Sequence, residues 1–577
     1  MPLHARASGY HRRLLACAVV AGLGVCAGAC TRQVQAPATG NLRFEISFPA
    51  SVRATPVTGR VFVAISRTGT PEPRLQAGSW VSVPFFGADV SQLAPATPAV
   101  IDGRALGYPL ESLRRLPPGD YYVQAILNVY TEFHRSDGHV IWAHMDHWEG
   151  QQFNRSPGNL YSEVRRIHLD AQAGYDVKLS LDQVIPPVQV PLDTEWVTHV
   201  KIQSKLLTAF WGHPMYLGAT VLLPKGYAAH PAERYPTIFV QGHFGLNPPF
   251  GFTTEQRPET DAARARRISM GRETGYQFYQ AWNSDNFPRM IAVTFQHPTP
   301  YFDDSYAVNS VNNGPYGDAL MTELIPYLES HFRMLNRPYA RVLTGGSTGG
   351  WESLALQLYH PAFFGGTWTL YPDPIDFRRY MLINIYKDAN AFYPPNPTGA
   401  WYVPERFFRR RSDGQPANTV QQLSQLEATL GSHGRSGQQL EIWEATYGPI
   451  GADGYPKPLW NKRTGVIDHS VADYMKAHGY DLRAYAQEHW PTIGPDLVGK
   501  LHLFVGDMDN FYLNLAVYLF EDFMKSTTHP YYAGSFAYGR PMKGHGWQGM
   551  TNADLIREMA AQVRRNAPAG ASTAWLH

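Results

Sequence analysis

The chain has 577 residues, of which 44% are hydrophobic, 13% aromatic and 17% charged. This length exceeds one ordinary domain, and the apolar and aromatic content excludes a disordered chain and predicts a large buried core. Because the formal net charge is only +2 and the basic residues are scattered, we expect no nucleic-acid partner.

Residues 1–30 have the pattern of an export signal peptide. Arg6, Arg12 and Arg13 form a positive region that precedes an apolar stretch at 14–29. That stretch is shorter than the about 20 residues that a membrane-spanning helix needs. No later run of 18 apolar residues follows, so we expect no transmembrane helix.

The three cysteines, Cys17, Cys26 and Cys30, all lie in this segment. We therefore expect neither a disulfide nor a cysteine-bound metal in the folded body. The run Ala27-Gly28-Ala29-Cys30 resembles the lipoprotein box of bacteria, although leucine is usual at the position of Ala27. The resemblance implies an exported protein, periplasmic or membrane-anchored through a lipid on Cys30, with ordinary signal cleavage as the alternative.

Residues 31–190 predict an N-terminal β-sandwich-like domain. After a short tether at 31–40, strand-like stretches follow at 42–48, 60–66, 121–127 and 177–181. Short strands separated by turns are typical of a sandwich. The proline-rich run at 186–191 then predicts a stiff linker.

Residues 191–577 predict alternating strands and helices, and hence a mostly parallel sheet with helices on both faces. We expect strands at 218–223, 235–240, 290–295, 341–344, 367–371 and 501–505, and helices at 275–282, 317–332 and up to about 525. Residues 377–500 are too long for one crossover, so they predict an insertion placed like a lid.

The segment Gly345-Gly346-Ser347-Thr348-Gly349 fits the pattern G-x-S-x-G. A strand-like stretch precedes it, and an apolar helical repeat follows it and stops before Pro361. This strand–turn–helix context is that of the nucleophile elbow, which exposes a serine hydroxyl near a helix N-terminus. We therefore predict an α/β-hydrolase domain with Ser347 as nucleophile.

A serine hydroxyl needs a base within hydrogen-bond reach, and in this fold the chain order is serine, acid, histidine. His545 lies between glycines in a loop after a strand-like stretch at 535–538 and is the expected base. His529 lies in a helix-ending context, and His577 ends the given sequence. We expect the rate to fall on the acid side, near the ordinary histidine pKa of about 6.5.

The acid that orients the histidine should follow a strand and precede His545. Asp509, after the strand at 501–505, is the expected residue, and Asp507 in the same turn is the first alternative. Asp373 and Asp376, after the preceding strand, are further alternatives.

The oxyanion hole needs two backbone donors. One is expected to be the amide of Thr348, directly after the nucleophile. The second should come from the glycine-containing loop at 241–245, where His243 is the expected donor residue and Phe244 the next.

These features together resemble the esterase D or putative esterase family, which includes enterochelin esterase-like hydrolases, feruloyl and acetyl esterases, S-formylglutathione hydrolase and mycolyltransferases. The resemblance covers about 200–577 without the insertion and is carried by 239–245, 314–332, the Ser347 elbow, the Asp509 turn and Gly-His-Gly-Trp at 544–547. It implies a serine esterase that hydrolyses a small-molecule, carbohydrate or siderophore-type ester through an acyl-enzyme, without cofactor or metal. The insertion and the β domain are departures that we expect to shape the pocket, so the substrate does not carry over.

Alternative functions are acyl transfer to an acceptor other than water, as in the mycolyltransferases, and a non-catalytic surface binding protein on a hydrolase scaffold. Two histidines and two acids at 141–149, and the pair Asp303-Asp304, could hold a cation, but we expect a polar loop and turn capping there. Aromatic residues of the insertion could stack on a sugar or fill a lid core; they are Tyr393, Trp401, Tyr402, Trp443 and Trp460.

Overall fold

The computed structural model describes residues 42–396 and 398–576. The expected signal peptide, the lipoprotein box with Cys30 and the tether at 31–40 lie outside the described residues. None of the helices in the described ranges combines the length and the apolarity that a membrane span requires.

The N-terminal β domain consists of two sheets, with strand orders β11-β1-β4 and β12-β9-β6-β2-β3-β5, and β10 pairs with β6. Its strands are β1 (Arg43–Ser47), β2 (Val57–Ser66), β3 (Phe85–Leu93), β4 (Ala99–Ile101), β5 (Leu106–Tyr108), β6 (Gly119–Val129), β9 (Leu160–Tyr161), β10 (Arg165–Leu169), β11 (Asp176–Ser180) and β12 (Gln183–Val184). A separate hairpin joins β7 (Thr131–His134) to β8 (Val140–Ala143).

Strand β2 is buried on both faces, because it separates two hydrophobic cores. Val61 and Val63 pack into the core of the β domain itself. Phe62 and Ala64, on the opposite face, belong to the large core that also contains the strands of the C-terminal sheet, between residues 197 and 539. The β domain is therefore packed onto the rest of the chain through a continuous apolar face.

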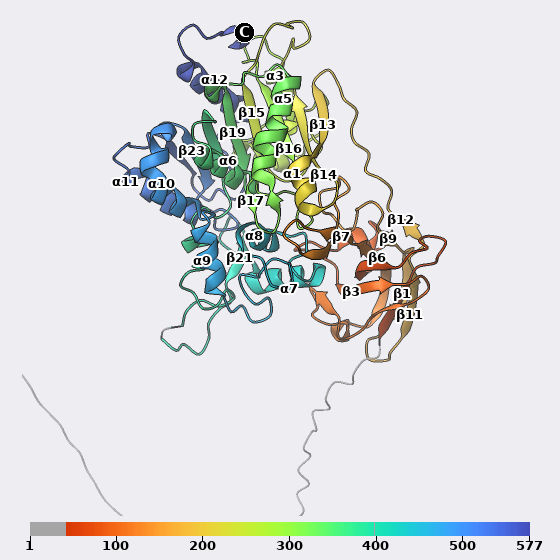
Figure 1. Cartoon of the computed structure of the whole chain (residues 1–577). Helices are drawn as coiled ribbons and strands as arrows, with labels where there is room; N and C mark the ends of the chain where they lie inside the picture. The colour runs from red at the N-terminus through yellow and green to blue at the C-terminus, as the bar shows by residue number, and fades with distance from the viewer. Residues whose placement is uncertain (1–41, 397, 577) are drawn as a thin grey trace, which may run out of the picture. The chain divides into compact units, whose positions relative to one another are not determined.

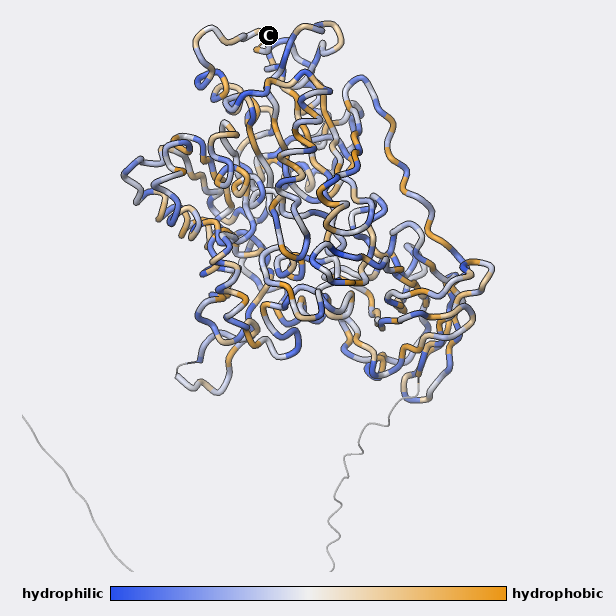
Figure 2. The backbone as a smooth tube through the Cα atoms, in the orientation of Figure 1, coloured by the Kyte–Doolittle hydropathy of each residue, from blue (hydrophilic) through white to orange (hydrophobic). Residues whose placement is uncertain are grey.

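The catalytic domain is an α/β-hydrolase fold built on an eight-stranded sheet of order β13-β14-β16-β15-β19-β20-β23-β24 (Figure 1). The strands are β13 (Val197–Ser204), β14 (Met215–Leu222), β15 (Thr237–Gln241), β16 (Ile291–Gln296), β19 (Arg341–Gly346), β20 (Gly366–Leu370), β23 (Leu501–Gly506) and β24 (Ser535–Gly539). The first two pairings are antiparallel and the other five are parallel. The strands of this sheet are rich in orange and white in Figure 2, as expected for strands covered on both faces.

Helices pack around this sheet and fix the ends of its strands. The helices are α1 (Lys205–Trp211), α2 (Asp261–Ser269), α3 (Gly275–Trp282), α4 (Tyr316–Ala319), α5 (Ile325–His331), α6 (Thr348–Tyr359), α11 (Asn514–Ser526) and α12 (Asn552–Asn566). The expected helix at 317–332 is interrupted by a π-helical segment, Leu320–Leu324. Helix α6 packs against β15, β19 and β20, so it starts where these strands end.

The expected insertion at 377–500 contains the hairpin β21 (Phe407–Arg410) and β22 (Pro416–Thr419), followed by α7 (Val420–Leu430), α8 (Gln439–Tyr447), α9 (His469–Ala477) and α10 (Leu482–Leu497). Helix α7 packs against β3 and β5 of the β domain, and α10 packs against α6 of the catalytic domain. Every residue of α8 except the first, Gln439, is buried. The insertion is therefore an integral layer between the β domain and the catalytic domain.

Candidate active site

Ser347 lies at a sharp bend between β19 and α6, with φ 59° and ψ −120°. These angles are strained for a residue with a side chain, and such strain is typical of functional sites. The bend closes because its neighbours lack side chains. A Cβ on Gly349 would lie 2.0 Å from the Gln241 carbonyl oxygen, and one on Gly345 would lie 2.2 Å from the Gly349 carbonyl oxygen.

His545 is paired with Asp509 in the same part of the fold. The Nδ1 atom of His545 lies 2.8 Å from Oδ2 of Asp509, whose side chain is fully buried. The rings of Tyr371 and Phe511 pack edge-on against the imidazole, with centroids 4.8 Å and 4.9 Å away. The contact with Asp509 places the imidazole proton on Nδ1 and leaves Nε2 as the atom that can accept a proton.

The other candidate acids have different partners. Asp507 accepts a hydrogen bond from the Lys543 amide at 3.0 Å, and Asp376 caps a helical turn and pairs with Arg378. The structure therefore brings Asp509, and not its alternatives, to the imidazole of His545.

Ser347 and His545 line one cavity of about 680 Å³. Within the described residues, the Ser347 hydroxyl donates to Oδ1 of Asp373 at 3.3 Å and makes no hydrogen bond to His545. Transfer of its proton to His545 therefore requires the hydroxyl to turn away from Asp373. The sequence had pointed to Asp373 only as an alternative partner of the histidine.

The two expected oxyanion donors come from segments that touch each other. Thr348 is the first residue of α6, where a backbone amide has no carbonyl partner within the helix. A Cβ on Gly349 would also meet the Gly242 nitrogen at 2.8 Å, so the first turn of α6 lies against the loop that carries His243. The Thr348 hydroxyl and Nε2 of His243 are 3.4 Å apart.

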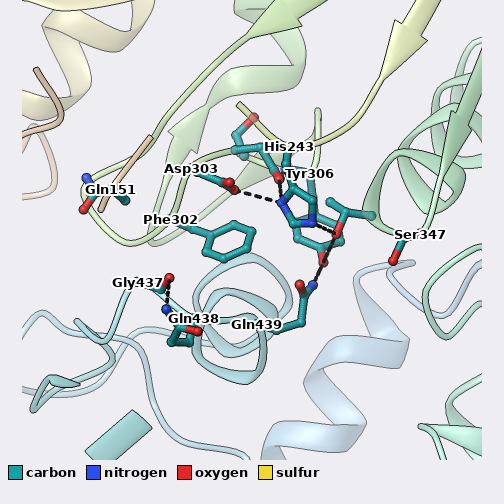
Figure 3. A network of polar contacts seen from close by, with 12 residues as sticks. Gln151, His243, Phe302, Asp303, Tyr306, Ser347, Gly437, Gln438 and Gln439 are labelled. Carbon is teal, nitrogen blue, oxygen red and sulfur yellow. Dashed lines mark hydrogen bonds and ion pairs between the residues drawn. The ribbon is translucent and has the colours of Figure 1, made fainter. Parts of the chain in front are cut away.

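The imidazole of His243 lies at the cavity between acidic and hydroxyl partners (Figure 3). Its Nδ1 atom is 3.1 Å from Asp303 and 3.4 Å from Asp304. Burial alone would lower the pKa of His243, but attraction to Asp303 and then to Asp304 outweighs it and raises the pKa well above its ordinary value. The two carboxylates therefore favour the protonated form of the ring.

A second acidic cluster lies behind this one. His297, Asp304 and Glu352 are all within 1% of complete burial, and burial raises the pKa of Glu352 well above its ordinary value. Residue types suited to a metal occur here and around His243. Nδ1 of His297 accepts the Ser305 amide, however, so the neutral ring carries its proton on Nε2, the atom that faces Glu352. A ring in that form offers no lone pair at Nε2, and burial favours the protonated form of Glu352.

The cavity walls come from three parts of the chain. The β domain contributes residues 75 and 77–80 and the loop segment 150–155, and the insertion contributes 437–439 and three apolar side chains. Gln151 of the β domain is held in place by a 2.7 Å hydrogen bond from its side chain to the Thr299 carbonyl of the catalytic domain. The β domain and the insertion were expected from the sequence to shape the pocket, but none of these β-domain residues was named as lining it.

The polar stretch at 141–149 anchors the loop that carries Gln151. Nε2 of His144 lies 2.9 Å from Glu149 and 2.6 Å from the hydroxyl of Ser156, and all three side chains are buried. Asp146 accepts the Gln151 amide at 2.7 Å. These groups bond each other across the loop, in agreement with a polar loop beside the catalytic domain.

The aromatic residues of the insertion divide between core and surface. Of the five residues singled out in the sequence, only Trp443 lines the cavity, where its indole N–H donates to the Tyr306 hydroxyl at 2.6 Å. Trp460 is buried away from it, and Trp401 is 97% exposed. The placement of these residues therefore does not support a sugar-stacking role for the group as a whole.

Comparison with known proteins finds a match between residues 216–373 and the family model described as putative esterase. The resemblance predicted from the sequence is confirmed for this segment, which contains the loop at 241–245, the bend at Ser347 and Asp373. No curated protein matches the chain.

Solved structures that resemble the chain include hydrolases. A ferulic acid esterase is 16% identical, with 64% of this chain and 97% of that chain covered and a TM-score of 0.33. An S-formylglutathione hydrolase from Agrobacterium tumefaciens is 12% identical, with 65% and 98% covered and a TM-score of 0.30. A fluorophosphonate-binding serine hydrolase F from Staphylococcus aureus is 12% identical, with 64% and 98% covered and a TM-score of 0.30.

Proposed function

We propose that the protein is a serine carboxylic-ester hydrolase that works through an acyl-enzyme. The observation that carries the proposal is the strained backbone of Ser347, which lines one cavity together with His545, whose Nδ1 atom is hydrogen-bonded to buried Asp509. The putative-esterase match over 216–373 supports the same reaction class.

The proposed reaction has two acyl-transfer steps. The Ser347 oxygen bonds to the ester carbonyl carbon while Nε2 of His545 takes the hydroxyl proton, and the amides of Thr348 and His243 stabilise the oxyanion. The carbon–oxygen bond to the alcohol then breaks, and the proton on His545 goes to the leaving oxygen. Water repeats the sequence on the acyl-enzyme and releases the acid.

The test is hydrolysis of a p-nitrophenyl ester by wild type and by Ser347→Ala. We expect the variant to lose activity and labelling by a fluorophosphonate probe, whereas the control Ser330→Ala, at an exposed helix position, keeps both. Equal activity of wild type and Ser347→Ala would contradict the proposal. Adding sugar or alcohol acceptors to the assay separates hydrolysis from the alternative, acyl transfer to a non-water acceptor.

We also propose that the protein is exported and anchored through a lipid on Cys30. The support is the sequence alone: an arginine-containing start, a short apolar stretch and Ala27-Gly28-Ala29-Cys30. Cys30→Ala should release the protein from the membrane fraction, and Cys26→Ala should not. Retention of Cys30→Ala in membranes would refute the anchor.

A further inference from the structure

Asp373 is a carboxylate placed directly beside the nucleophile by the end of β20. It is 4% exposed and lines the cavity, and its backbone amide donates to the Ser347 carbonyl at 3.1 Å. The catalytic cycle described above gives this carboxylate no task, because Asp509 already orients His545. A negative charge close to a developing oxyanion is costly unless another group compensates it.

The two carboxylate oxygens of Asp373 have different numbers of hydrogen-bond donors. Oδ2 accepts hydrogen bonds from the Tyr306 hydroxyl at 2.7 Å, the Thr348 hydroxyl at 3.1 Å and the Gln439 side chain at 3.1 Å. Among the residues that the structure describes, Oδ1 accepts a hydrogen bond only from the Ser347 hydroxyl, at 3.3 Å. Figure 3 shows the side chain of Gln439, from the insertion, pointing toward the Tyr306 hydroxyl of the catalytic domain. The three donors fix the carboxylate, so that Oδ1 is aimed at the nucleophile.

Oδ1 loses its one donor when the reaction starts. Ser347 has a single proton, and this proton must pass to His545 before or while the acyl bond forms. Asp373 then carries an almost buried oxygen without a partner, and a buried acceptor left unpaired costs more than an ordinary lost hydrogen bond. A donor on the substrate itself would restore the contact at the moment when it is needed.

We propose that Asp373 selects esters whose acyl part carries a hydrogen-bond donor, an ammonium or a hydroxyl group, on the carbon next to the carbonyl. The inference rests on the proposed esterase function. Once the acyl group is bonded to the Ser347 oxygen, a substituent on that carbon lies only three bonds from this oxygen, which itself is 3.3 Å from Oδ1. Such a group can reach Oδ1, whereas an unsubstituted acyl chain leaves Oδ1 unpaired and an acidic one would be repelled.

The experiment compares three p-nitrophenyl esters with the same carbon chain: 2-aminobutanoyl, 2-hydroxybutanoyl and butanoyl. After subtraction of the spontaneous rate, we expect kcat/KM of wild type to be about 10- to 100-fold higher for the 2-amino ester than for the butanoyl ester, and less strongly raised for the 2-hydroxy ester. In Asp373→Asn the preference for the 2-amino ester should fall to near unity. In Asp303→Asn, which changes another acid of the cavity, the same preference should persist.

For each variant, the preference is the ratio of kcat/KM for the 2-amino ester to kcat/KM for the butanoyl ester. This ratio distinguishes a role of Asp373 in substrate selection from a purely structural role. If Asp373 only braces the elbow, Asp373→Asn slows all three esters equally and keeps the ratio, which overturns the proposal. A wild-type ratio near unity overturns it as well. If no ester is hydrolysed above the Ser347→Ala background, the proposed function itself fails, and the inference fails with it.

A measurement on wild type alone covers the case in which Asp373→Asn does not fold. Boronic acids add to a serine oxygen and place their carbon substituent where the acyl chain would lie. We expect 1-aminopropylboronic acid to inhibit at about tenfold lower concentration than propylboronic acid. Equal inhibition would overturn the selection of a donor while leaving the esterase function intact.

Discussion

Replacing Asp509 by asparagine should disable the base without disturbing its position. Oδ1 of Asp509 accepts the backbone amides of Phe511 at 2.9 Å and Leu513 at 3.3 Å. In Asp509→Asn these two donors keep the amide oxygen on their side, so the NH₂ group takes the place of Oδ2, 2.8 Å from Nδ1 of His545. The imidazole must then accept at Nδ1 and carry its proton on Nε2, the tautomer that cannot take a proton from serine.

Loss of the correct tautomer predicts a fall in kcat on the order of 10³- to 10⁴-fold for Asp509→Asn. The matched control is Asp507→Asn in the same turn. Its oxygen accepts the Lys543 amide at 3.0 Å, and an asparagine oxygen can do the same, so we expect a change of no more than about threefold.

The assay is p-nitrophenyl ester hydrolysis together with the rate of fluorophosphonate labelling, which reports the nucleophilicity of Ser347 directly. Melting temperatures establish that both asparagine variants are folded. Similar losses in the two variants, or an Asp509→Asn enzyme that keeps more than about a tenth of wild-type kcat, would refute this reasoning.

Three further predictions follow from the same geometry. Gly349→Ala forces a methyl group to 2.0 Å from the Gln241 carbonyl oxygen, so it should lower the melting temperature. The clash should also move the amide of Thr348, an expected oxyanion donor, and reduce kcat for the p-nitrophenyl ester by about 10²-fold. Arg135→Ala removes a fully buried side chain that donates hydrogen bonds to backbone carbonyls of the catalytic domain and the insertion, so it should lower the melting temperature by several degrees. The control Arg104→Ala removes an exposed side chain that pairs with Asp102, and it should leave the melting temperature near that of wild type. The pKa of His243 is raised in the folded protein, so its protonated ring stabilises the fold. This stabilisation is complete below the unfolded pKa of about 6.5 and is lost as the pH rises through the folded pKa. The difference in melting temperature between wild type and His243→Gln should therefore be larger at pH 6.5 than at pH 9, and an equal difference would contradict the raised pKa.

The features that sequence could predict are those that local backbone chemistry determines. Glycines around Ser347 mark a bend that closes only without side chains, and the polar turn containing Asp509 follows a buried strand. The apolar run of strand β2 predicts a strand that is buried on both faces. It does not reveal that one face packs in the core of the β domain and the other in the large core shared with the catalytic domain. Strand β13 was not predicted, since half its residues are only partly buried and its alternation is weak.

The features that sequence could not predict depend on contacts between distant segments. The environment of Asp373 is set by Tyr306, Thr348 and Gln439, and each of these residues comes from a separate loop or helix start. Nothing near residue 373 in the sequence indicates three donors on one oxygen. Similarly, Gln151 reaches the cavity only because the β domain packs against the catalytic domain.

The room for bulky substrates and the reaction chemistry therefore depend on different parts of the structure. The reacting groups are held by strand ends and the start of α6, which are among the most buried elements of the described chain. The outer walls are held by contacts across the domain boundary, such as Arg60 to the Thr429 carbonyl at 3.0 Å and Gln425 to the Gly107 carbonyl at 2.7 Å. Loosening these contacts changes the shape of the cavity but not the spacing of Asp509 and His545. Variants at this boundary should consequently raise KM for bulky esters while the rate of fluorophosphonate labelling stays close to that of wild type.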